Sequence, residues 1–332
     1  MALPRLSPRA YRCITLGATL ALATIIVTGA AVRLTGSGLG CTDWPTCEQG
    51  QLAPADMSHA PAMIEFVNRL FTGVVSVAVI LAVLGSMLRR PRRGDLTWLS
   101  AGLVIGVVAQ ILLGAAVVLL ELSPQLVMGH FLLSMVLLWN AVVLHHRAGR
   151  PEGQAVAVVE PLVLRLGRTL FAVAAVVIFT GTVVTATGPH AGDQLATRLG
   201  FHLPDVARVH GLSVVVMVVL TLSLVALLVR RGAPERVRVT GAVLVVLLLA
   251  QAGVGYAQWF AGVPALLVGV HIIGAIAVWT TVVRLNLVLS AVLSPTTGGR
   301  RLQEHPPDHR DHRDHRDDRD DETRRDQTLA AT

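Results

Sequence analysis

Three histidines and one asparagine stand at matched spacings in the two halves of this chain. Asn68 precedes His130 by 62 residues, and His210 precedes His271 by 61 residues. The second half therefore offers two imidazoles where the first half offers one imidazole and one amide. Neutral imidazoles are good axial ligands for haem iron, so the spacing predicts a haem site at His210 and His271. The alternative is that these histidines only form hydrogen bonds between helices.

An acidic residue lies beside the position that lacks a histidine. Glu65 comes three residues before Asn68 and shares its helix face. It is a candidate proton relay or charge stabiliser, although a carboxylate near a helix start also stabilises that end. Arg69, Arg33 and Arg208 lie near helix ends and are suited to pairing with carboxylates such as haem propionates. Interfacial snorkelling of their long side chains is the alternative.

Two cysteines follow the first apolar stretch. Cys41 and Cys47 are separated by TDWPT, with Pro45 favouring a turn between them. In an oxidising compartment this pair is expected to form a disulfide. A redox-active pair is the alternative, and the loop holds no CxxCH motif for covalent haem attachment.

The elements that position these residues are membrane-spanning helices. Apolar residues make up 53% of the chain and charged residues 15%, values typical of an integral membrane protein. A span needs about 20 mainly apolar residues. Eight stretches qualify, and they are too long for barrel strands, so the predicted fold class is an all-α integral membrane protein. The predicted spans are 14–34, 64–88, 97–120, 125–145, 168–187, 205–229, 238–260 and 265–290.

Arginine placement predicts the orientation. The loops after the second, fourth and sixth spans are rich in arginine, whereas 35–63 has no basic residue except His59. The positive-inside rule then places both termini in the cytoplasm of a cell-membrane protein, with the histidines toward the outer side. Orientation explains the net charge of +7, so no nucleic-acid partner is expected. The charged segment 296–332 is predicted to be a disordered cytoplasmic tail.

The two halves also resemble one another in sequence. VTGAAVRLTGSG at 27–38 resembles FTGTVVTATGPH at 179–190, and Gln110 and Gln251 each precede a histidine by twenty residues. These glutamines are expected to form interhelical hydrogen bonds. Because each unit has four spans, the two units form a parallel repeat about an axis along the membrane normal. We therefore predict one four-helix bundle at 1–150 and a second at 151–295.

The segment RLTGSGLGCTDWPTC at 33–47, followed by IEFVNRL at 64–70, resembles the first outer loop and second helix of the haem A synthase family. The duplicated eight-helix plan and the later histidines also match, so the resemblance covers about residues 1–290. It implies an enzyme that oxidises the C8 methyl of haem O to the formyl group of haem A for terminal oxidase assembly. It also implies haem O as substrate, from a haem O synthase. The electron donor is not indicated.

The resemblance implies roles for individual residues as well. His210 and His271 would hold a resident haem b, and His130 would bind the iron of the substrate haem. The family's Glu-x-x-His motif reads Glu65-Phe66-Val67-Asn68 here. Glu65 is thus implied in catalysis, while Asn68 departs from the pattern. The family's paired cysteines correspond to Cys41 and Cys47.

Two other functions compete with this interpretation. A b-type membrane cytochrome that only transfers electrons would bind haem without producing haem A. A transporter built from repeats would bind no haem. Neither explains why the two halves differ at the position of Asn68 and His210.

Overall fold

Long helices form most of the computed structural model, which describes residues 5–48 and 50–293. Within these residues, eight helices are long and apolar enough to cross a membrane, which confirms the predicted fold class. They are α1 (Pro8–Leu34), α2 (Ala60–Leu88), α3 (Gly94–Leu119), α4 (Pro124–Ala148), α5 (Pro161–Thr187), α6 (Leu203–Arg230), α7 (Glu235–Phe260) and α8 (Ala265–Val288). The predicted tail at 296–332 lies outside the described residues.

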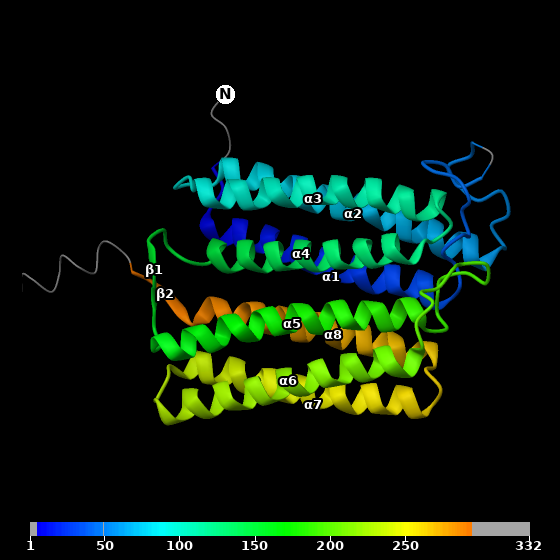
Figure 1. Ribbon diagram of the computed structural model, residues 1–332. Coiled ribbons are helices and arrows are strands. Elements are labelled where there is room, and N and C mark those ends of the chain that lie inside the picture. Colours follow the sequence, from blue (N-terminus) through cyan, green and yellow to red (C-terminus); the bar gives the residue numbers. More distant parts are fainter. Residues whose placement is uncertain (1–4, 49, 294–332) are drawn as a thin grey trace, which may run out of the picture. The chain divides into compact units, whose positions relative to one another are not determined.

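The helices form two groups of four (Figure 1). In the first group each of α1 to α4 packs on its neighbour in sequence, and α4 returns to pack on α1. In the second group α5 to α8 do the same. Helix α4 contacts both α5 and α8, and α1 contacts α8, so these four make the seam between the groups. The boundary at residue 150 and the parallel-repeat axis stay predictions.

Three aromatic side chains meet at the seam around the buried Trp279. Trp279 of α8 stacks on Phe171 of α5, with ring centroids 5.0 Å apart, and Trp139 of α4 lies 6.5 Å from Phe171. The indole N–H of Trp279 donates to the carbonyl of Met135 at 2.9 Å. Because a buried indole N–H needs an acceptor, this bond fixes α8 against α4.

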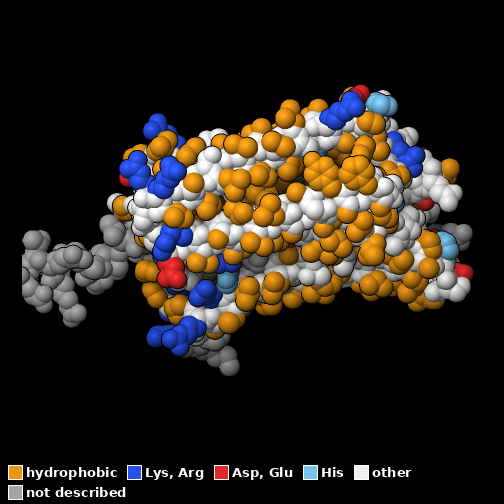
Figure 2. Space-filling model, turned by 90° about the horizontal axis from the view of Figure 1, so that it is seen from below, with side chains coloured by type: hydrophobic (Ala, Val, Ile, Leu, Met, Phe, Trp, Pro, Cys, Tyr) orange, Lys and Arg blue, Asp and Glu red, His pale blue; other side chains and the backbone are white. Residues whose placement is uncertain are grey.

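The loops collect at two ends of the bundle. The arginine-rich loops 89–93, 149–160 and 231–234 share what we term the basic end, and loop 35–59, with its cysteines, lies at the opposite disulfide end. Figure 2 shows apolar side chains along the helices and most of the visible basic side chains at one end. This arrangement is typical of a multi-pass membrane protein. The side of the membrane that each end faces stays a prediction.

Some helices extend beyond the predicted apolar spans. Helix α1 begins at Pro8 and α5 at Pro161, six and seven residues earlier than the apolar stretches indicate. Proline is favourable in a first helical turn, and helices continue beyond the hydrocarbon core into the polar interface. A small hairpin was also missed, because the short strand β1 (Gln154–Ala157) pairs antiparallel with β2 (Ser290–Leu293). Each strand is only four residues long, which is too short for an alternation of apolar and polar residues to predict it.

Trp279→Phe tests the seam contact. We expect the free energy of unfolding to fall by about 1–2 kcal/mol, from the lost interhelical hydrogen bond and lost packing. Thermal unfolding of the purified protein in detergent measures the change. Trp98→Phe is the matched control, because Trp98 is 80% exposed on α3. Equal melting temperatures for the two variants would contradict the role of the bond.

Candidate functional site

His210 of α6 and His271 of α8 face one another near the disulfide end. Their ring centroids are 6.5 Å apart and the ring planes are nearly perpendicular, at 78°. Two metal–nitrogen bonds of about 2 Å each, plus the two ring radii, require a centroid separation of about 6 Å. The pair therefore has the spacing of two axial ligands on one iron. Two neutral imidazoles are a donor set that suits haem iron.

Thr180 of α5 fixes the orientation of His210. The Thr180 hydroxyl donates to the carbonyl of Val177 at 3.0 Å, so its oxygen can accept the Nδ1–H of His210 at 3.1 Å. In the tautomer that this contact accommodates, the imidazole proton is on Nδ1 and the Nε2 lone pair is free for a metal. A hydrogen bond of this kind orients a ligand ring and strengthens it as a donor.

The first group of helices has a similar contact at Asn68. The hydroxyl of Thr28 on α1 lies 2.8 Å from Asn68 Oδ1 and 3.3 Å from the carbonyl of Ile25. Thr28 and Thr180 are each followed by glycine in the two similar segments. The threonine thus holds an amide in one group and an imidazole in the other.

Glycines on neighbouring helices face the three histidine rings. A Cβ atom at these positions would approach the ring Cε1 to between 3.2 and 3.5 Å. The pairs are Gly114 with His130, Gly181 with His210, and Gly255 with His271. At Gly29, which follows Thr28, a Cβ would meet nothing within 4 Å. Three rings therefore pack against bare backbone, whereas the smaller Asn68 side chain leaves space beside Gly29.

The backbone at two histidines is held by glutamine. The Nε2 atoms of Gln110 and Gln251 donate to the carbonyls of His130 and His271, at 3.0 and 3.3 Å. The predicted interhelical role of both glutamines is confirmed. The Nδ1 atoms of His130 and His271 are buried and have no partner among the described residues.

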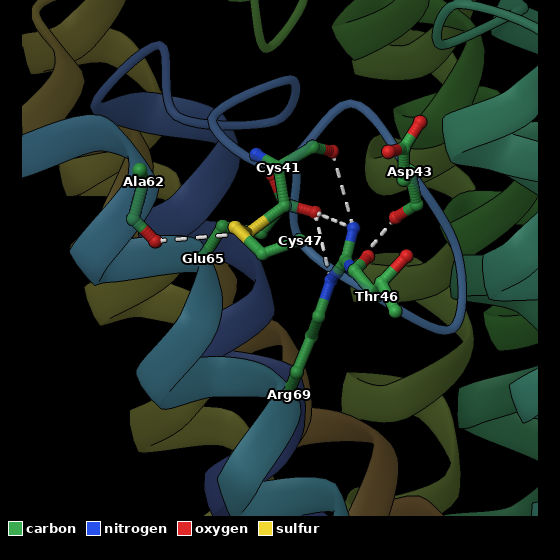
Figure 3. A network of polar contacts seen from close by, with 7 residues as sticks. All are labelled: Cys41, Asp43, Thr46, Cys47, Ala62, Glu65 and Arg69. Atoms are coloured by element: carbon green, nitrogen blue, oxygen red, sulfur yellow. Dashed lines mark hydrogen bonds and ion pairs between the residues drawn. A yellow bond between two sulfur atoms is a disulfide. The ribbon is translucent and has the colours of Figure 1, made fainter. Parts of the chain in front are cut away.

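Glu65 is buried, with 4% exposure, and both of its carboxylate oxygens accept hydrogen bonds (Figure 3). Its Oε2 accepts the backbone N–H of Cys41 at 2.8 Å. Its Oε1 accepts from Nε and Nη2 of Arg69 at 3.0 and 2.5 Å. A carboxylate buried among apolar helices needs such partners, and here a guanidinium and a backbone N–H compensate its charge.

Arg69 also holds the loop that carries the cysteines. Its Nη1 donates to the carbonyls of Asp43 and Thr46, both at 2.9 Å, and its Nη2 donates to the carbonyl of Cys41 at 3.2 Å. The predicted disulfide between Cys41 and Cys47 is present. With these contacts and those to Glu65, every N–H of the guanidinium is used. A haem propionate at Arg69 would have to displace one of them.

The other two arginines lie apart from this network. Arg33 donates to the carbonyls of Thr185 at 2.9 Å and His190 at 2.6 Å, so it joins α1 to the last turn of α5 and to the loop after it. Arg208 is exposed and pairs with Asp205 at 3.2 Å.

Comparison with known proteins identifies the family. The sequence profile of the COX15-CtaA cytochrome oxidase assembly proteins matches residues 12–283. The chain belongs to this family. Heme A synthase from Exiguobacterium sibiricum is 30% identical over 176 residues, which cover 51% of this chain and 57% of that protein. Heme A synthase from Shouchella clausii is 32% identical over 174 residues, with the same two coverages. The chain thus spans little more than half the length of these family relatives.

Sequence reasoning missed the residues that support the ligands. Thr28 and Thr180 lie inside the similar segments at 27–38 and 179–190, so the similarity of these segments could have identified both threonines as candidate supporting residues. The glycines at 114, 181 and 255 gave no signal by themselves, because only helix rotation shows which residues they face. The link from Arg69 to the loop was missed because it depends on the path of backbone carbonyls.

Arg69→Gln should release the disulfide loop. Removing one partner of a buried ion pair costs about 3–5 kcal/mol, so we expect the amide of Cys41 to exchange hydrogen at least about a hundredfold faster. Hydrogen exchange measured by mass spectrometry tests this. Arg208→Gln is the control, since Arg208 pairs only at the exposed surface. Unchanged exchange at residues 41–47 would show that Arg69 does not hold the loop.

Proposed function

We propose that this chain is a haem A synthase that oxidises the C8 methyl of haem O to the formyl group of haem A. Membership of the family and the name of the relatives support the proposal. The observation that carries it is the difference between the two groups of helices. One has two imidazoles at the spacing of axial ligands, and the other has a buried carboxylate beside an amide.

The difference extends beyond the ligand position. In the aligned halves, Asn68 and His210 correspond, so Glu65 corresponds to Ala207 and Arg69 to Gly211. The second group thus lacks both members of the ion pair. An electron carrier needs no such pair, whereas oxidation of a methyl group needs a residue that can accept protons.

The C-terminal residues would hold a haem b. His210 and His271 would hold it through their imidazole nitrogens, and a haem held by two histidines would supply electron transfer. Thr180 would keep Nε2 of His210 directed at the iron, and Gly181 and Gly255 would let the rings pack closely.

The N-terminal residues would act on haem O. His130 would bind the substrate iron, and Asn68, a poor axial ligand, would leave the opposite side open. With water as the oxygen source, each two-electron oxidation, first of the methyl to the alcohol and then of the alcohol to the hydrated aldehyde, releases two protons toward Glu65 and two electrons to an external electron acceptor. The hydrated aldehyde then loses water to give the formyl group. Haem O would come from a haem O synthase, and the product would pass to terminal oxidase assembly. The basic end would face the cytoplasm and the haem sites the outer side of the cell membrane.

Haem extraction tests the proposal. The chain is co-expressed with a haem O source in cells that lack haem A, and the extracted haems are identified by mass. We expect haem A with the intact chain, and no haem A from Glu65→Gln, which should keep the Soret band of haem b. Glu121→Gln, an exposed carboxylate at the same end, is the control and should behave as wild type. Haem b without haem A from the intact chain would indicate an electron carrier, and no Soret band would indicate a transporter.

Asn68→His tests the open coordination position. The added imidazole should shift the substrate haem to a six-coordinate, low-spin spectrum and slow its conversion, because the iron would be saturated. Absorption spectra of the protein loaded with haem O measure the shift. The reverse substitution, His210→Asn, should alter only the haem b spectrum. An unchanged spectrum in Asn68→His would contradict the proposed role of Asn68.

A further inference from the structure

Basic side chains from both groups of helices converge at the basic end of the seam. Arg12 of α1 lies against the loop after α4, where a Cβ on Gly149 would be 2.9 Å from its Nε. His146 of α4 lies within electrostatic reach of Arg150, Arg236 and Arg284. We call the set the seam cluster, which consists of Arg12, His145, His146, Arg150, Arg236 and Arg284.

Two carboxylates at this end pair with arginines outside the cluster, and Glu152 and Glu235 form no ion pair with it in the described part of the chain. Asp95 pairs with Arg93 at 2.7 Å and lies 3.7 Å from Arg147, and Glu160 pairs with Arg231 at 3.2 Å. Within residues 5–48 and 50–293, no carboxylate lies within ion-pair distance of an arginine of the seam cluster. Burial and then the charge of Arg236 lower the pKa of Arg150. The cluster is therefore an excess of positive charge without a counter-ion in the described chain.

The backbone around the seam cluster is fixed by hydrogen bonds. Arg93 Nη1 donates to the carbonyls of Arg147 and Arg150, at 3.1 and 2.6 Å. Arg150 Nη1 donates to the carbonyl of Ser290 at 3.2 Å, which joins the loop after α4 to β2. Arg150 thus belongs to a held loop, and Arg12, Arg236 and Arg284 belong to helices. The backbone positions are therefore fixed, while the exposed side chains of Arg12, Arg236 and Arg284 are free to turn toward an anion.

We propose that the seam cluster binds the headgroup phosphate of an anionic phospholipid. The cluster lies at the ends of spanning helices, where lipid headgroups lie, and apolar side chains continue along the helices for the acyl chains (Figure 2). Guanidinium groups match phosphate oxygens in geometry and charge. The site joins the two groups of helices and is independent of the proposed haem chemistry.

Native mass spectrometry of the full chain in detergent tests the site. The protein is titrated with phosphatidylglycerol and, separately, with phosphatidylcholine. We expect tighter binding of phosphatidylglycerol, weakened about tenfold or more in the double variant Arg236→Gln/Arg284→Gln. The control double variant Arg165→Gln/Arg168→Gln removes the same charge from exposed positions at the same end and should change binding by less than about twofold. If the first double variant does not fold, Arg284→Gln alone should weaken binding in the same direction.

Four outcomes would overturn the proposal. Equal losses in both double variants would show a diffuse surface potential, and equal binding of phosphatidylcholine would show acyl-chain packing alone. Displacement of the lipid by millimolar inorganic phosphate would identify a site for free phosphate. Lipid binding that arises only after deletion of 294–332 would show that this segment, which is rich in Asp as well as Arg, covers the cluster.

Discussion

A charged group buried among apolar helices is stable only when a partner compensates it, and Arg69 provides that partner for Glu65. The same guanidinium accounts for the order of the loop, because its remaining donors bind carbonyls between Cys41 and Thr46. The backbone at Cys41 in turn donates to Glu65, so carboxylate, arginine and loop support one another. A change at any of the three therefore alters the environment of the other two.

The same requirement explains the contacts around the histidines. A spanning helix satisfies its own backbone, so its polar side chains must find partners on neighbouring helices. Thr180 serves His210 in this way, and Thr28 serves Asn68. Gln110 and Gln251 serve the backbones of the other two histidines. The threonine and glutamine contacts are therefore alike in both groups of helices. The groups differ chiefly in the side chain that the threonine contacts, Asn68 or His210, and in the Glu65–Arg69 ion pair, which only the first group has.

The sequence predicted what depends on composition and spacing. The eight apolar stretches correspond to eight helices among the described residues, because a segment that crosses lipid must satisfy its backbone hydrogen bonds internally. The matched sequence intervals singled out Asn68 and the three histidines. Helix starts at Pro8 and Pro161 were missed, because hydropathy reports the hydrocarbon core rather than the helix. The use of every Arg69 donor and the glycine behind each ring depend on helix rotation and loop path, which one sequence does not determine. Propionate binding by Arg69 stays a prediction that competes with its contacts to the loop.

The seam is joined at three depths by contacts of different kinds. At the disulfide end Arg33 donates to backbone carbonyls of the second group, and in the apolar interior Trp279 donates to Met135. At the basic end Arg150 donates to Ser290. Contacts at both ends and in the middle resist rocking of one group against the other. On the proposed function this rigidity has a use, because electrons would pass between two haems held in different groups of helices. The separation of those haems would then be set by the packing of α1 and α4 on α5 and α8 rather than by either site alone.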